Sequence, residues 1–118
     1  MAKNDMPVII YKILKYLYEC MKAGKQPDEM DFCAESKLIS IPLLYWNCVI
    51  REMYDNGFVR GVSVLSTKDG PLIILDSDFN ITLKGVEFLE DNTLMQKVRE
   101  HLGTAIEVTI GTLVKAII

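Results

Sequence analysis

The fold is decided by the stretch GFVRGVSVLSTKDGPLIILD at residues 57–76. Apolar residues stop recurring at helical spacing at Gly57, and β-branched valines then stand beside polar residues, which is typical of an exposed strand. Asp69-Gly70 is a favourable turn dipeptide between two extended runs. The stretch therefore predicts a β-hairpin over roughly residues 58–76.

Three helices are predicted before this hairpin. The first runs from Pro7 to Gly24, with apolar residues on one side and lysines largely on the other. Asp28 can cap a short second helix that extends to Leu38. Ser40-Ile41-Pro42 opens the third helix, with Ser40 as the capping residue, and Asn56-Gly57 ends it.

Helical spacing returns after the hairpin. Thr82 is placed to cap a helix over Val86 to Leu89, and Asp91-Asn92-Thr93 breaks or re-caps it before a last helix. Three helices, a hairpin and further helix are the order of an α+β winged helix-turn-helix. We expect a winged-helix domain at residues 1–92 and an apolar C-terminal helix at residues 93–118.

Bulk composition fits one folded domain. The chain has 118 residues, of which 50% are hydrophobic and 25% charged, with a net charge of −3. The first residues are polar, and no window has the ~20 apolar residues that a membrane span needs. We therefore expect a cytoplasmic protein without a membrane segment.

Residues that could support catalysis or metal binding are sparse. Cys20, Cys33 and Cys48 are far apart in sequence, and the single histidine, His101, stands in a helical segment. A zinc site would need clustered cysteine or histidine ligands, and a nucleophile would need a neighbouring base. We expect no enzyme, no metal and no cofactor.

The segment ITLKGVEFLEDN at residues 81–92 resembles the ITxKGxxxLEEN-type stretch of the YjcQ-like family, small winged-helix proteins from Gram-positive bacteria and their phages. Similarity to the family's junction between third helix and wing is carried by Ile50 through Met53, Gly57, Phe58, Val59 and Gly61. The resemblance covers roughly residues 7–100. It implies a winged-helix fold and a phage or prophage origin, but no active site.

Charge weighs against DNA binding in the usual winged-helix geometry. Residues 26–57, the expected helix-turn-helix, carry two basic and six acidic residues, a net charge of −4. Most non-specific DNA affinity comes from phosphate contacts, which such a segment would oppose. If DNA does bind, the candidate contacts are Lys37, Tyr45, Asn47, Arg51 and Lys68.

The third helix presents an apolar outer face. Its expected core stripe is Leu43, Trp46, Ile50, Met53 and Tyr54, which leaves Leu44, Tyr45 and Cys48 on the opposite side. Such residues are typical of a protein-binding surface. Alternatively, the second helix or the C-terminal segment covers them.

An apolar stripe also runs along the last helix. Its members recur three or four residues apart at Val98, Leu102, Ile106, Ile110, Leu113 and Ile117. This spacing predicts a homodimer seam between two copies of the helix. The alternative is that the helix packs across the first helix of its own chain.

Two functions are consistent with these patterns. The first is a non-enzymatic, oligomerising protein-interaction module, and the acidic helix-turn-helix at residues 26–57 favours it. The second is a DNA-binding transcriptional regulator of winged helix-turn-helix type, which rests on analogy of fold.

Overall fold

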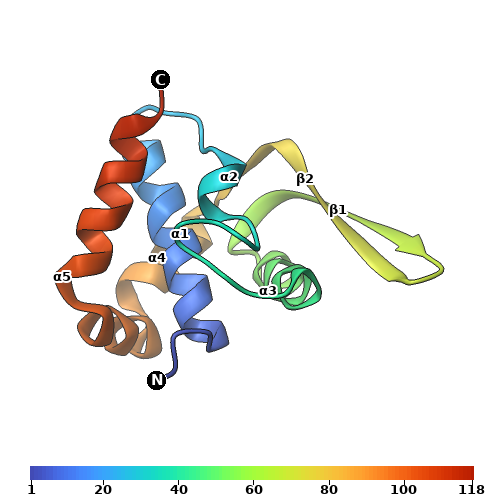
Figure 1. The fold of residues 1–118 in the computed structure, drawn as a ribbon, viewed down its shortest axis with the longest axis horizontal. Coiled ribbons are helices and arrows are strands. Elements are labelled where there is room, and N and C mark those ends of the chain that lie inside the picture. The colour runs from blue at the N-terminus through green and yellow to red at the C-terminus, as the bar shows by residue number, and fades with distance from the viewer.

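The computed structural model describes residues 1–118 as five helices and one two-stranded antiparallel sheet (Figure 1). The elements are α1 (Met6–Lys22), α2 (Glu29–Phe32), α3 (Leu43–Asp55), β1 (Val59–Thr67), β2 (Gly70–Ile81), α4 (Leu83–Asp91) and α5 (Thr93–Ala116). Figure 1 shows α5 along one side of α1, α3 toward the other side, and the β1–β2 hairpin projecting from the helical body. This α+β arrangement is compatible with a winged helix.

Helix α1 forms the centre of the core. Its sequence MPVIIYKILKYLYECMK places apolar residues on more than one face, and nine of them are buried. Because α1 is buried on several sides, it needs neighbours on each of them, and α3, α4 and α5 all contact it. Met95, Val98 and Ile110 of α5 belong to the same core cluster as α1. Residues 93–118 therefore share one core with residues 1–92.

The hairpin predicted from residues 57–76 is present, and its second strand is longer than expected. The register runs from Val59 opposite Ile81 to Thr67 opposite Gly70. The hairpin was expected to end near residue 76, but its second strand continues to Ile81. The reason is that Phe79 and Ile81 are buried and anchor the base of the hairpin in the core.

A bulge between Arg60 and Val62 bends the base of the hairpin. Gly61 lies at the bulge with φ +77°, and a Cβ there would lie 2.6 Å from the backbone nitrogen of Phe79. Only glycine meets both conditions without strain. The bulge therefore fixes how the outer part of the hairpin leaves the body.

The second helix is shorter than the sequence predicts. Asp28 caps it as expected, accepting a hydrogen bond from the Met30 N–H at 3.0 Å. The helix ends at Phe32, however, and the predicted extension to Leu38 is wrong. Leu38 lies in a non-helical segment and is nevertheless buried. Its apolar side chain therefore indicates burial in the core and not a position in the helix.

Ser40 does not cap α3, contrary to the prediction. It pairs with Glu35 in an isolated antiparallel bridge, and the adjacent Ile41 N–H donates to the Ala34 carbonyl at 2.9 Å. The residue at the N-cap of α3 is Pro42, which offers no side-chain hydrogen bond. The connection between α2 and α3 is thus a loop that contains an isolated β-bridge.

Helix α4 begins at the predicted cap. The Thr82 hydroxyl accepts from the Gly85 N–H at 3.1 Å and donates to the Gly57 carbonyl. Replacing Thr82 by alanine is expected to lower the free energy of unfolding by about 1–2 kcal/mol, because both hydrogen bonds are lost. Urea denaturation followed by circular dichroism measures the change. Thr82→Ser keeps the hydroxyl and should lower the free energy of unfolding by less than half as much as Thr82→Ala. Equal decreases for the two variants would contradict the capping role of the hydroxyl.

Helix α5 is capped by Asn92, whose side chain accepts from the N–H groups of Leu94 and Met95. The predicted unbroken helix is wrong at Gly103, where φ is 66° and ψ is −157°. Figure 1 shows the helix turning there, so that its last half runs alongside α1. None of the five helices combines the length and the hydropathy that a membrane-spanning helix requires.

Candidate functional site

Helix α3 has one buried face and one exposed face. Trp46, Val49, Ile50 and Met53 are buried against the core. The expected core stripe is wrong at both of its ends, because Leu43 and Tyr54 are exposed and Val49 is buried. Val49 lies three residues after Trp46 and four before Met53, on the same face of the helix. Leu43 and Tyr54 lie in the first and last turns of α3, at the two ends of this buried face.

A groove lies between the exposed face of α3 and the hairpin, and we call it the α3–wing groove. Its lining consists of Leu44, Asn47, Cys48 and Arg51 from α3 and Pro71 and Ile73 from β2. Leu44 is 72% exposed at the groove. Neither α2 nor α5 contributes a residue to this lining, so the alternative that these elements cover Leu44 and Cys48 does not hold.

The outer part of the hairpin extends the apolar surface beyond the groove. Val64 pairs with Ile73, and Leu65 pairs with Leu72. Cross-strand partners share a face of a sheet and successive residues alternate between faces. Val64 therefore lies on the same face as Ile73, the groove face, while Leu65 and Leu72 lie on the other. All of these except Ile73 are substantially exposed, and Ile74 is exposed as well.

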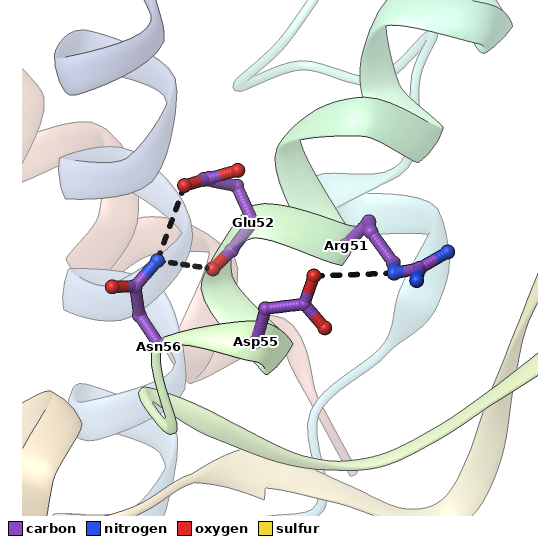
Figure 2. A network of polar contacts seen from close by, with 4 residues as sticks. All are labelled: Arg51, Glu52, Asp55 and Asn56. Atoms are coloured by element: carbon purple, nitrogen blue, oxygen red, sulfur yellow. Dashed lines mark hydrogen bonds and ion pairs between the residues drawn. The ribbon is translucent and has the colours of Figure 1, made fainter.

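Acidic residues outnumber basic ones in α3 and the hairpin taken together. Arg51 is the only basic residue of α3, and its Nε lies 3.2 Å from an oxygen of Asp55 (Figure 2). On the other side of the helix end, the Asn56 amide donates to the Glu52 carbonyl and carboxylate at 2.8 and 3.2 Å. Residues 43–81 carry three basic and five acidic residues, a net charge of −2.

The five candidate DNA contacts do not form one surface. Asn47 and Arg51 line the groove, whereas the Tyr45 hydroxyl donates to the Asn4 carbonyl at 2.7 Å and so reaches toward the N-terminal segment. Lys37 is exposed on the α2–α3 loop, and Lys68 lies in the hairpin turn beside an aspartate. The basic charges are therefore dispersed and partly neutralised.

The three cysteines lie in different environments. Cys20 is buried in α1, and burial raises the pKa of its thiol. Cys33 is partly buried and its sulfur lies 3.2 Å from the Glu35 carbonyl. Cys48 is exposed in the α3–wing groove. No group of three or more histidine, cysteine or acidic side chains is close enough to hold a metal ion.

The apolar stripe of α5 faces its own chain. Ile110 and Leu113 are buried in the core shared with α1, and Leu102, Ile106 and Ile117 are partly buried against it. This arrangement agrees with the alternative expectation, in which the last helix packs across the first helix of its own chain. The predicted seam residues Ile110 and Leu113 are thus not on a surface open to a second copy.

Sequence reasoning missed the contribution of the hairpin to the site. Pro71 and Ile73 line the groove, yet residues 71–75 were predicted only to form part of a strand. The signal that could have found them is its composition. Five consecutive apolar residues exceed what a hairpin with one solvated face requires.

Comparison with known proteins identifies the chain by family alone. Residues 11–106, from the first turns of α1 to the middle of α5, match the profile of the family described as YjcQ protein. Searches of curated proteins and of solved structures found no match. The match covers most of the chain and agrees with the resemblance noted at residues 81–92, and the chain therefore belongs to the YjcQ family.

Proposed function

We propose that this protein is a non-enzymatic protein-interaction module that binds an apolar segment of a partner protein in the α3–wing groove. The partner segment carries lysine or arginine residues beside its apolar side chains. The family resemblance supports a phage or prophage origin. The module acts by binding, with the hairpin and α3 as the two walls of its site.

The observation that carries this proposal is that apolar side chains from α3 and from the hairpin meet at one groove. Leu44 and Cys48 from α3 face Pro71 and Ile73 from β2 across it, and Val64 continues the apolar wall outward. Scattered apolar residues are normal on a surface, but a contiguous exposed apolar group is typical of a protein-interaction surface. An apolar partner side chain would displace water from such a groove.

Electrostatics select the chemistry of the partner. The region of α3 and the hairpin has a net charge of −2, and its one groove cation, Arg51, is engaged by Asp55. A net negative charge over α3 and the hairpin disfavours nucleic-acid phosphates and favours basic residues that flank an apolar segment. The groove therefore favours a basic, apolar peptide over DNA.

Peptide selection tests the proposal directly. A displayed random-peptide library selected on the full-length protein should yield apolar peptides with basic flanks that bind with micromolar affinity. Leu44→Asp should weaken these peptides at least tenfold, because truncating a central apolar contact removes on the order of 2 kcal/mol. Val108→Asp is the matched control, since Val108 is 68% exposed on α5, outside the groove, and it should leave binding unchanged.

The competing function is tested with the same protein preparations. Fluorescence anisotropy with a random DNA duplex at low salt should show no micromolar binding. Micromolar binding that weakens steeply as salt rises would replace the proposal with the DNA-binding regulator. Selected peptides that bind Leu44→Asp as tightly as the wild type would also overturn it.

A further inference from the structure

The bend in α5 depends on one residue. Gly103 has φ 66° and ψ −157°, a backbone conformation that is essentially restricted to glycine. A Cβ at this position would meet no atom within 4 Å. The bend is therefore maintained by the backbone torsions of Gly103, and side-chain packing at this position leaves room for another residue.

The sequence on both sides of the bend also fits a straight helix. Val98, Leu102, Ile106 and Ile110 follow one another at intervals of four residues across Gly103. In an unbroken helix these four side chains would share one face. The segment contains no proline, and Asn92 caps its start. The same sequence thus supports a bent and a straight form.

Contacts that hold the bent form are made mostly by the second half of α5. Ile110 and Leu113 are buried against the core, and the Lys25 ammonium donates to the carbonyls of Val114 and Lys115 at 3.0 and 3.3 Å. A second copy of the chain offers the same partners. These contacts can therefore be exchanged between two chains without loss.

One ion pair connects the two halves of α5 across the bend. Arg99, before Gly103, lies 3.7 Å from a carboxylate oxygen of Glu107, after it. In a straight helix, eight residues separate their Cα atoms by about 12 Å along the axis, and the pair would be broken. The pair is well exposed to solvent, so it opposes opening only weakly.

We propose that α5 opens at Gly103 and that two copies of the chain exchange the segment after it, giving a reciprocal dimer. Each straightened α5 carries residues 104–116 onto α1 of the second copy. Leu102 and Ile106, which are only partly buried in the bent form, then lie at the junction where the two straight helices meet. Exchange of identical elements is a low-cost route to a dimer.

Gly103→Ala tests the proposal by disfavouring the bend. Alanine is strained in the bent conformation and favours helix, so the dimerisation constant should rise by about a hundredfold or more. Light scattering at protein concentrations of about 10–500 micromolar measures the monomer–dimer equilibrium. Gly111→Ala is the matched control: Gly111 lies in the same helix without positive φ and has no atom within 4 Å of a Cβ, and it should leave the equilibrium unchanged.

Two further measurements show whether the dimer is exchanged. Amide hydrogen exchange in residues 108–114 should stay as slow as in the monomer, because these residues are buried again on the second copy. Dissociation after dilution should be slow, since the segment must leave its site first. Fast dissociation, loss of protection in this segment, or a variant that remains a folded monomer would overturn the proposal.

If Gly103→Ala fails to fold, the wild-type chain carries the test. Refolding from urea at about millimolar concentration should trap a dimer that persists on dilution, whereas refolding at micromolar concentration should give monomer. Monomer at both concentrations would overturn the proposal. Leu44→Asp should leave the exchange unchanged, so this inference and the proposed groove function can fail separately.

Discussion

Replacing Ile110 by glutamate is expected to lower the free energy of unfolding by about 3–5 kcal/mol, because it places a carboxylate in an apolar interface. Ile110 is 1% exposed, where α5 packs on α1. Three charged residues line the same surface hollow as Ile110, and these are Lys15, Glu19 and Glu107. Lys15 already lies 3.0 Å from Glu19, so the new carboxylate would meet two existing ones and no free cation.

Two controls separate charge burial from other effects. Ile110→Ala removes the side chain without adding charge and should lower the free energy of unfolding by about 2–4 kcal/mol. Val108→Glu places the same carboxylate on the exposed side of α5 and should change it by less than about 0.5 kcal/mol. Urea denaturation at neutral pH measures all three. An Ile110→Glu protein as stable as Val108→Glu would contradict the packing of α5 on α1.

The features that could be predicted from sequence are those with local physical causes. Thr82 and Asn92 cap helices through hydrogen bonds that reach two or three residues along the chain. Asp69-Gly70 lies at the hairpin turn, where Gly70 has φ +111°. Each signal lies within a few residues of the structure it determines, and each prediction was confirmed.

Element ends were mispredicted where distant residues determine them. Phe79 extends β2 beyond the polar residues 76–78 because its ring stacks on Phe32 of α2, with centroids 5.6 Å apart. Leu38 was assigned to a helix, yet it is buried from a loop, and the Lys12 ammonium donates to its carbonyl at 3.1 Å. These partners are remote in sequence, and no local pattern identifies them.

The candidate site shows the same division. The apolar outer face of α3 followed from helical periodicity, and Leu44 and Cys48 do lie in the groove. Tyr45 was grouped with them, but its hydroxyl is directed to Asn4. The stripe of α5 is equally compatible with a partner helix and with α1, because periodicity identifies an apolar face but not what covers it. The bend at Gly103 places the stripe on α1 of the same chain, and periodicity alone does not predict this bend.

Replacing Trp46 by alanine is expected to lower the free energy of unfolding by about 3–5 kcal/mol, because a large buried ring leaves a cavity. Trp46 is 4% exposed, on the inner face of α3. Its indole N–H donates to the Phe32 carbonyl at 3.1 Å, which ties α3 to the end of α2. Phe32 in turn stacks on Phe79, so the loss should loosen α2 and the base of the hairpin together.

Trp46→Phe separates the cavity from the hydrogen bond. Phenylalanine keeps much of the ring volume but leaves the Phe32 carbonyl without its donor, and we expect a loss of about 1–3 kcal/mol. Far-ultraviolet circular dichroism in urea measures both variants, since Trp46 is the only tryptophan and its fluorescence is lost with it. If Trp46→Ala unfolds at the same urea concentration as the wild type, Trp46 is not a core residue. Equal losses for the two variants would instead make the hydrogen bond, and not the ring volume, the main contribution of Trp46.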